Sequence, residues 1–278
     1  MSTTAIERTV ERPPAPPRGW PRERIIGVAL MGLWIAFGLG LVFYLVLAWN
    51  PELVDRYAGN YLRGLGVTLS LVTISVIAGA VLSIPVAYGR MSKNPILSAV
   101  AYGYVYFFRG TPLLAQTYLV YYGLGSFRPE LQAVGLWWFF REAWYCAIFA
   151  FALNTAAYQA EILRGAIESI PRGQWEGAEA LGLSKLQTLR KIVLPQALIV
   201  ALRPYGNEII LMIKGSAIVA IITVYDLMGE TRRAYSRSFD FQTYIWAALL
   251  YLAIVEALRH AIEWIERRLT RHLTHLHH

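Results

Sequence analysis

Cysteine and charge are both scarce in this sequence, and each shortage excludes a class of protein. The only cysteine, Cys146, allows no disulfide within the chain and no thiolate cluster for a metal. Charged residues make up 16% of the 278 residues, against about 25% in ordinary soluble domains. Hydrophobic residues make up 56%, so the surplus apolar surface has to face lipid rather than water. The composition therefore predicts a membrane protein.

Catalytic and nucleotide-binding motifs are missing as well. No Gly-Lys-Ser/Thr occurs, so the chain has no phosphate-binding loop of its own. No Ser/His/Asp set or paired-carboxylate site is visible, and the nearest approach to a nucleophile–base pair is Ser216 with Lys214. Histidines crowd the C-terminus, where we expect a solvated tail rather than a metal site: His272, His275, His277 and His278. We predict no catalytic residue and no metal or cofactor bound by this chain.

Long apolar runs dominate what is present. A helix that crosses the hydrocarbon core needs about 20 apolar residues. Six runs have at least this length: 25–48, 64–89, 95–125, 143–170, 195–225 and 241–262. The third contains Arg109 and is interrupted by Thr111-Pro112, where we expect the helix to break. The pattern predicts an all-α membrane protein with about six transmembrane helices.

Lysines and arginines are unevenly distributed between the ends of these runs. With the N-terminus in the cytosol, the cytosolic segments hold 16 of them and the outer segments hold 7. Cytosolic segments normally carry the excess, so we expect both termini inside the cell. Because the basic residues form no single patch, the sequence argues against a nucleic-acid partner. Residues 1–24 are expected to form a disordered cytosolic tail, and residues 267–278 a second cytosolic tail.

The segment 169–195 lies between the fourth and fifth runs, on the cytosolic side in this orientation. Pro171 suits a first helical turn, and Gly182 can end that helix in the left-handed conformation. Ser184 followed by Gln187 forms a capping box that opens a second helix, and Pro195 marks the next break. These signals predict a compact helix–turn–helix knob in the cytosol.

The spacing within this knob resembles the cytosolic signature of type I ABC importer permeases: Glu-Ala-Ala, three residues, Gly, nine residues, Ile, one residue, Leu-Pro. Gly177 replaces the first alanine of that signature. The resemblance implies that segment 171–194 contains coupling helices that dock on a separate ATPase. The residues carried over are Glu176, Ala178, Glu179, Gly182, Ile192, Leu194 and Pro195. The alternative is an ordinary amphipathic loop on the membrane surface.

Three further motifs resemble the branch of these permeases that carries polar amino acids, with its histidine, glutamine, arginine and opine members. They are Phe107-Phe108-Arg109-Gly110-Thr111-Pro112-Leu113, Asn154-Thr155-Ala156-Ala157-Tyr158 with Glu161-Ile162, and Tyr205-Gly206-Asn207-Glu208-Ile209-Ile210. The C-terminal third most resembles the M-type subunit of the histidine and octopine systems. The resemblance implies an ABC type I transmembrane domain over residues 62–266, with 25–48 as an additional leading helix.

The same resemblance implies a function and a set of partners. The chain resembles a permease subunit of an ATP-driven importer for polar, above all basic, amino acids or opines across the bacterial inner membrane. The implied partners are a second permease (a paralogue rather than a copy), two ATPase subunits that bind ATP and Mg, and a periplasmic substrate-binding protein. The alternative is an ion-coupled secondary transporter or channel, which would need inverted repeats or charged relays. The identity of the substrate stays open.

Polar residues inside the apolar runs are candidates for the substrate path, since a charged residue at bilayer depth costs about 2.5–3.5 kcal/mol. Asn154, Tyr158 and Glu161 recur at the spacing of one helical face. Glu161 is equally compatible with an ion pair to Arg203, because both lie 21 residues from Gly182.

Three further path candidates lie in the third and fifth runs. Thr111 and Gln116 flank Pro112, and the alternative is that they only pack the kink. Lys214 lies deep in the fifth run, where contact with substrate, pairing with a carboxylate and snorkelling to the interface are all open.

Overall fold

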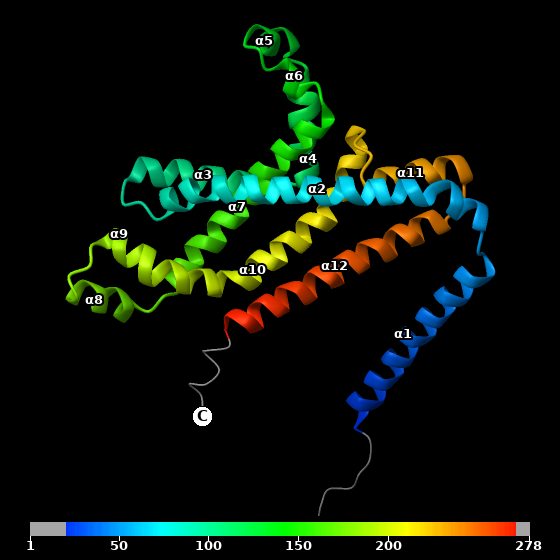
Figure 1. The fold of residues 1–278 in the computed structure, drawn as a ribbon, viewed down its shortest axis with the longest axis horizontal. Helices are drawn as coiled ribbons and strands as arrows, with labels where there is room; N and C mark the ends of the chain where they lie inside the picture. The colour runs from blue at the N-terminus through cyan, green and yellow to red at the C-terminus, as the bar shows by residue number, and fades with distance from the viewer. Residues whose placement is uncertain (1–20, 271–278) are drawn as a thin grey trace, which may run out of the picture. The chain divides into compact units, whose positions relative to one another are not determined.

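The computed structural model describes residues 21–270, which fall into two units. The first unit runs to Pro51 and holds one helix, α1 (Arg22–Leu47); the second begins at Glu52 and holds the rest of the chain (Figure 1). The helices of the second unit, in chain order, are α2 (Pro51–Arg90), α3 (Pro95–Gly110), α4 (Leu113–Tyr118), the π-helix η1 (Leu119–Gly123), α5 (Arg128–Ala133), α6 (Trp137–Phe140), α7 (Ala143–Glu168), α8 (Arg172–Ala180), α9 (Lys185–Thr188), the π-helix η2 (Leu189–Val193), α10 (Leu194–Gly215), the 3₁₀-helix η3 (Ser216–Ile222), α11 (Leu227–Ser238) and α12 (Gln242–Leu269).

Most of each predicted tail lies outside the described residues, as do the four histidines of the C-terminus. The parts that are described are helical rather than tail-like. Residues 22–24 form the first turn of α1, and residues 267–269 form the last turn of α12. Charged side chains at these positions are solvated by snorkelling outward, so they extend a membrane helix without ending it.

Five helical stretches of residues 21–270 are long and apolar enough to cross a membrane: Arg22–Leu47, Pro51–Arg90, Ala143–Glu168, Lys185–Ile222 and Gln242–Leu269. They account for five of the six predicted runs. The run 95–125 is divided among α3, α4 and η1 instead of forming one helix. Pro112 has no N–H to donate to the carbonyl of Phe108, so the helix breaks there as predicted.

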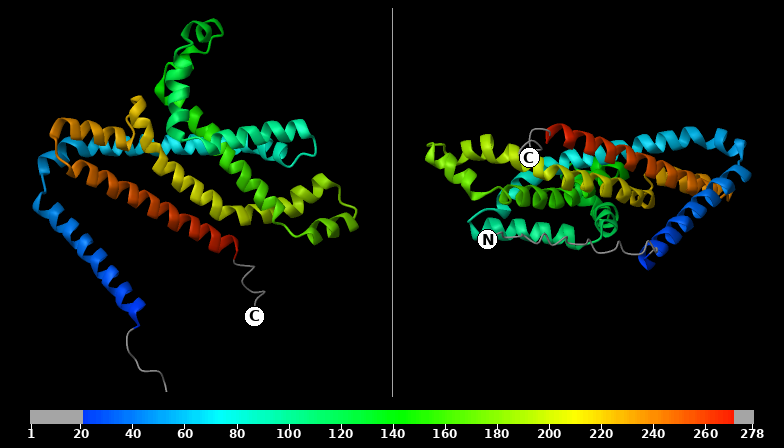
Figure 2. Two further views of the ribbon diagram at one scale, coloured as in Figure 1. Left: turned by 180° about the vertical axis from the view of Figure 1, so that it is seen from behind. Right: turned by 90° about the horizontal axis from the view of Figure 1, so that it is seen from below.

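α7 is the central helix of the second unit. It packs against α3, α4 and α10, and α10 in turn packs against α12, so that α10 lies between α7 and α12 (Figure 2). Alanines on several sides of α7 are fully buried, among them Ala147, Ala156 and Ala160. Small side chains allow neighbouring helices to approach closely, which is how membrane helices pack when lipid is as apolar as their own surfaces.

The predicted knob is present, with one correction. Pro171 precedes α8, Gly182 adopts the left-handed conformation with φ +74°, and the capping box of Ser184 with Gln187 opens α9. Pro195, however, does not break the chain: α9, η2 and α10 follow without interruption, and Pro195 occupies the first turn of α10. The π-helical turn of η2 shifts the hydrogen-bond register just before the proline, so the missing N–H breaks no helix.

The second unit has two distinct ends. α8, α9 and the start of α3 lie at one end, whereas α11 and the first turns of α2 and α12 lie at the other (Figure 1). The chain between α4 and α7, with α5 and α6, extends to one side of the unit (Figure 1).

Candidate functional site

The polar face predicted for α7 borders three neighbouring hollows. Asn154, Tyr158 and Glu161 follow one another along the helix, and Tyr158 lines all three spaces. One hollow of about 180 Å³ lies among α4, α7 and α10. A second of about 460 Å³ continues past Gly165 and Ser169 towards α8, and a third of about 380 Å³ lies against α3. Polar side chains and open space thus follow the same side of α7.

A buried carboxylate lines the smallest hollow, and the sequence analysis did not assign it to the site. Glu208 on α10 is 7% exposed, and the hydroxyl of Thr155 donates a hydrogen bond of 2.9 Å to its Oε1. Asn154 and Tyr158 line the same space. The signal was present in the sequence, because an acidic residue within an apolar run is a functional candidate by default.

Arg109, at the end of α3, supplies the opposite charge. Its guanidinium lies over the ring of Tyr158, with Cζ 5.1 Å from the ring centre. The same arginine lines both of the larger hollows, next to Glu161. Groups of both signs, Arg109 and Glu208, therefore flank the phenol of Tyr158, an arrangement suited to a molecule that carries both an ammonium and a carboxylate.

Thr111, Gln116 and Asn154 form one hydrogen-bond network at the helix break. Gln116 donates through Nε2 to the carbonyl of Phe108 at 2.9 Å and to the Thr111 hydroxyl at 2.7 Å. Asn154 donates to the same carbonyl at 3.0 Å and to Oε1 of Gln116 at 2.9 Å. The Phe108 carbonyl is the acceptor that Pro112 cannot serve, so these amides replace the missing backbone donor. Of these three path candidates, Thr111 and Gln116 hold the kink, and Asn154 holds it and also lines a hollow.

Glu161 is held by two arginines, neither of which is the predicted Arg203. Arg90, at the end of α2, donates to its Oε1 at 2.8 Å, and Arg164 donates to its Oε2 at 2.8 Å. Arg164 also pairs with Glu168 at 2.6 Å. The side chains of Arg90 and Glu161 are only 18% and 13% exposed, so this pair joins α2 to α7 largely out of water.

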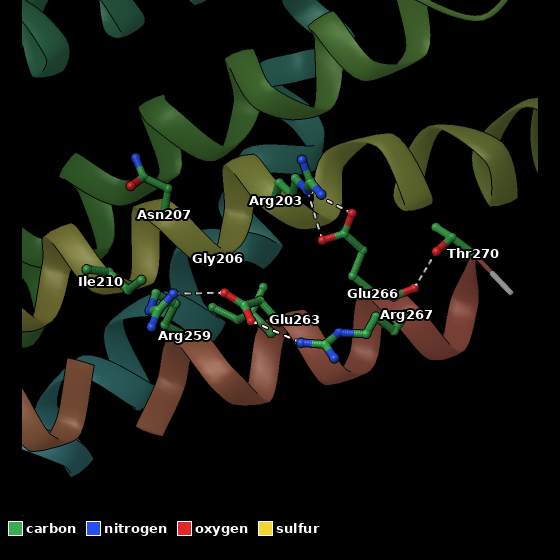
Figure 3. Close-up of a pocket in the computed structure, with 10 residues that line it drawn as sticks. Arg203, Gly206, Asn207, Ile210, Arg259, Glu263, Glu266, Arg267 and Thr270 are labelled. Carbon is green, nitrogen blue, oxygen red and sulfur yellow. Dashed lines mark hydrogen bonds and ion pairs between the residues drawn. The ribbon is translucent and has the colours of Figure 1, made fainter. Parts of the chain in front are cut away.

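Arg203 pairs instead with Glu266 on α12, where its Nε donates to both carboxylate oxygens, at 2.7 and 2.8 Å (Figure 3). This pair borders a hollow of about 700 Å³ between α10 and α12, whose other ion pairs join Glu263 to Arg259 and Arg267 (Figure 3). The equal distance of Glu161 and Arg203 from Gly182 predicted equal depth but not orientation, and Arg203 faces away from α7 towards α12.

Lys214 is exposed on α10 and lines none of the hollows around Tyr158. Ser216 is buried, and its hydroxyl donates to the carbonyl of Ile213 at 2.8 Å. The weak nucleophile–base pair suggested by Ser216 and Lys214 therefore does not form in this structure.

The knob is fixed to the membrane helices by a small apolar core. Ile167 of α7 and Ile170, just beyond its end, pack with Val193 of η2 and Ala197 of α10. Trp175 of α8 packs against the same cluster. Because one core includes α7, α8 and α10, a push on α8 has to move the two helices that line the hollows.

The residues predicted for ATPase coupling divide into an exposed and an anchoring set. Glu176, Glu179 and Gly182 are exposed, as is the adjacent Leu181 at 80%. Ala178 is buried on the inner side of α8, and Ile192 and Leu194 are half-buried, whereas Pro195 is exposed. The tip of the knob thus presents carboxylates and an apolar side chain, which suits docking into a groove of another protein.

Membrane-length helices around a polar path, with a rigid knob at one end, define this chain as a multi-pass membrane permease. The family model described as "Binding-protein-dependent transport system inner membrane component" matches residues 75–272, and the chain belongs to this family. Membership replaces the alternative of an ion-coupled secondary transporter, because it makes the chain the permease subunit of an ABC transport system.

Similar proteins of established name fall within the branch suggested by the sequence motifs. The chain is 45% identical to the nopaline transport system permease protein NocM of Agrobacterium fabrum, over 80% of this chain and 92% of that protein. It is 41% identical to the octopine transport system permease protein OccM of Rhizobium meliloti, over 76% and 88%. It is 36% identical to the arginine ABC transporter permease protein ArtM of Escherichia coli, over 77% and 96%.

Solved structures agree on the fold. An amino acid ABC transporter crystallised with histidines is similar with a TM-score of 0.69 and 32% sequence identity, covering 77% of this chain and 96% of that one. The MetNI methionine ABC transporter, in an inward-facing conformation, has a TM-score of 0.65 at 22% identity, covering 78% and 99%, and supports the fold alone.

Proposed function

We propose that this permease imports polar amino acids or opines, driven by a separate ATPase that docks on the knob of α8 and α9. The observation that carries the proposal is the shared core of Ile167, Trp175 and Val193, which links the knob to the helices of the path. The relatives named for nopaline, octopine and arginine transport support the substrate class.

The assembly around the chain follows from the same proposal. A second permease subunit, a paralogue rather than a copy, completes the membrane part. Two ATPase subunits bind ATP and Mg and contact the knob from the cytosol, and a periplasmic binding protein delivers the substrate. The excess of arginine and lysine on the knob's side of the membrane supports this orientation, with both termini in the cytosol.

Substrate passes along α7 in this proposal, through the hollows that meet at Tyr158. Glu208 binds the ammonium group, Arg109 binds the carboxylate, and the phenol of Tyr158 lies between them. Asn154 holds the shape of the path through its bond to the Phe108 carbonyl. The pair of Glu161 with Arg90 closes the wall of α2 against α7.

The coupling proposal is tested by reversing the exposed charge of the knob with Glu176→Lys. We expect transport to fall at least tenfold, with loss of the ATPase subunit from the purified complex or loss of the link between hydrolysis and transport. Folding of α8 should not change, because Glu176 is exposed and the buried residue of this turn is Ala178. The loss of transport would therefore report on contact between the knob and the ATPase. Transport in proteoliposomes and subunit ratios after purification measure the two effects.

Glu130→Lys is the matched control, because it makes the same exchange at an exposed position of α5. It should leave hydrolysis coupled to transport. Unaltered assembly and transport with Glu176→Lys would show that the knob does not contact the ATPase.

A further inference from the structure

A groove between α10 and α12 plays no part in the proposed substrate path. It is the hollow of about 700 Å³ beside the Arg203–Glu266 pair, and it shares no lining residue with the hollows around Tyr158 (Figure 3). The two helices meet at Gly206, where an added Cβ would lie 2.6 Å from Cδ1 of Ile262. The groove therefore follows a close helix–helix contact, with side chains from one face of each helix along it.

The length of α12 places this groove among lipid headgroups. Its 28 residues measure about 42 Å at a rise of 1.5 Å per residue, which matches a bilayer with both headgroup layers. All the acidic and basic side chains of the helix lie between Glu256 and Arg268, in its last turns. Those turns lie at the end of the second unit that carries α8 and α9 (Figure 1).

Two arginines of the groove keep hydrogen-bond donors in reserve. Arg203 binds Glu266 through Nε alone, and within residues 21–270 its two terminal nitrogens donate to no acceptor. Arg267 donates to Glu263 through Nη2, so its Nε and Nη1 are not used by any described residue. Both side chains are 78% exposed, so these donors are open to a ligand.

The balance of charge in the groove is positive. Three arginines line it, against the two carboxylates of Glu263 and Glu266. Both carboxylates are already paired, Glu266 with Arg203, and Glu263 with Arg259 and Arg267. The glutamates thus hold the guanidinium groups in position and leave one positive charge for a ligand. A planar guanidinium with free N–H groups matches the oxygens of a phosphate.

Apolar side chains beside the arginines favour a phosphate that carries a hydrocarbon chain. Ile210 and Ile262 line the groove itself. Leu252 and Leu249 continue the α12 face of Arg259 towards the middle of the membrane, and they are 57% and 43% exposed. A free anion would gain nothing from these residues, whereas basic pockets between membrane helices on the cytosolic side bind anionic lipid headgroups.

We propose that this groove binds the phosphate of an anionic phospholipid of the cytosolic leaflet through Arg203 and Arg267, with an acyl chain along Ile210 and Ile262. The inference rests on the proposed function, which places the knob's end of the permease in the cytosol. The bound lipid bridges α10 to α12, and so stabilises the packing of a helix that lines the substrate path.

The test titrates the complete, detergent-purified transporter with phosphatidylglycerol and measures bound lipid by native mass spectrometry. The double variant Arg203→Gln/Arg267→Gln should raise the apparent Kd for this lipid about tenfold, because two charge-assisted contacts are lost. Arg203→Lys/Arg267→Lys keeps both charges without the planar forks, so its loss should be smaller. Equal affinity of the glutamine variant and the unmodified complex would overturn the proposal.

Thermal unfolding in nanodiscs gives a second readout that also controls for folding. In pure phosphatidylcholine the glutamine variant should unfold close to the temperature of the unmodified complex, because Arg203–Glu266 is an exposed pair. Adding phosphatidylglycerol should raise the unfolding temperature of the unmodified complex more than that of the variant. An equal rise in both would contradict a site at these arginines.

Lys93→Gln/Arg268→Gln is the matched control. It removes the same charge from the same side of the membrane, at two exposed positions that do not line the groove. Arg268 is also the neighbour of Arg267 on α12. This variant should bind phosphatidylglycerol like the unmodified complex, and a loss equal to that of the glutamine variant would show only general attraction to the membrane surface.

Further arms separate the possible sources of the ligand. Inorganic phosphate alone should neither displace phosphatidylglycerol nor raise the unfolding temperature; if it did both, the groove would belong to a soluble anion and the lipid proposal would be overturned. Loss of the ATPase subunits from the glutamine variant, with unchanged lipid binding, would overturn it in favour of a protein contact. None of these measurements uses transport, so absent uptake by the unmodified complex would count against the importer function and not against the lipid site.

Discussion

Buried polar side chains in this protein divide by whether their hydrogen bonds are already used. Gln116 has its amide fully committed to the carbonyls and hydroxyl around Pro112. Within residues 21–270 the side chain of Glu208 accepts one hydrogen bond, from Thr155, and the residue borders a hollow. An amide whose hydrogen bonds are all used stabilises the fold, whereas a carboxylate with free acceptor capacity can bind a transported substrate.

Two substitutions should separate these roles. Gln116→Leu removes the donors for the Phe108 and Thr111 carbonyls, so unfolding should become easier by about 1–3 kcal/mol. Glu208→Gln keeps the size and the bond from Thr155 but removes the charge, so stability should hold while transport falls at least tenfold. Thermal unfolding of the purified complex and uptake in proteoliposomes measure the two. Gln132→Leu makes the same exchange at an exposed position and is the control for Gln116→Leu. If Gln116→Leu abolished transport without lowering stability, Gln116 would belong to the substrate site rather than to the kink.

Asp226 introduces a pH dependence at the start of α11. Burial raises the pKa of its carboxyl from 3.8 to about 6, against the opposing pull of the N–H of Gly229, which donates to it at 2.8 Å. The group binds a proton more tightly when folded than when unfolded. Its contribution to stability is therefore complete below about pH 4 and is lost as the pH rises through about 6.

The corresponding prediction concerns Asp226→Asn. The unmodified protein should lose roughly 2–3 kcal/mol of stability from this site between pH 4 and pH 8. The amide still accepts from Gly229 but carries no charge, so the variant should be more stable than the unmodified protein at pH 8 and similar at pH 4. Unfolding temperatures across this range test it, with exposed Asp55→Asn as the control. A variant that is less stable at pH 8 would contradict the assignment.

At the scale of elements, two ion pairs join helices, and they differ in their access to water. Arg90–Glu161 joins α2 to α7 with both side chains less than 20% exposed. Arg203–Glu266 joins α10 to α12 with the arginine 78% exposed. Water and salt screen Arg203–Glu266 more strongly than Arg90–Glu161. The two pairs should therefore differ in interaction free energy although their distances are similar.

Double-mutant cycles should make this difference measurable. Removing Glu161 leaves Arg90 and Arg164 facing each other without their common partner, so the cycle of Arg90→Ala with Glu161→Ala should give a coupling energy of about 1–3 kcal/mol. The cycle of Arg203→Ala with Glu266→Ala is the control and should give under about 1 kcal/mol. Unfolding of the purified permease in mild denaturant supplies the values; equal coupling in both cycles would show that burial of the first pair is not maintained.

Local signals predicted the elements well where they depended on neighbours in sequence. The break at Pro112, the left-handed Gly182 and the capping box of Ser184 all follow from residues within one or two turns. The prediction at Pro195 was wrong because a change of hydrogen-bond register in η2 relieved the proline. The predicted pairing of Glu161 with Arg203 was wrong, because equal depth in the membrane does not specify which way a side chain points.

At the scale of the whole molecule, the described chain consists of a lone helix and a transport unit. No residue of α1 is buried, and the helix is apolar on every side. The family match begins at residue 75, well beyond α1. The transport unit, from Glu52 onward, holds the three buried clusters that stabilise its helices.

Deletion of residues 1–48 should therefore preserve transport. The remaining spans are still oriented by the basic residues of the knob and of the α2–α3 connection, so the new N-terminus should lie outside the cell. Uptake by cells expressing the shortened chain, and labelling of a cysteine introduced at its N-terminus by a reagent that does not cross the membrane, measure both outcomes. Loss of the complex on deletion would show that α1 is needed to assemble it.

The sequence by itself determined that this chain is a helical membrane protein, where its helices break and which segment forms the knob. Each of these depends on composition, periodicity or short-range backbone chemistry, and those are readable along one dimension. Only the tertiary structure decided that Glu208 and Arg109 flank Tyr158, that Gln116 serves the kink and that Arg90 holds Glu161. These pairings join residues from different helices, and the rotation of each helix about its axis is set by packing rather than by any local signal.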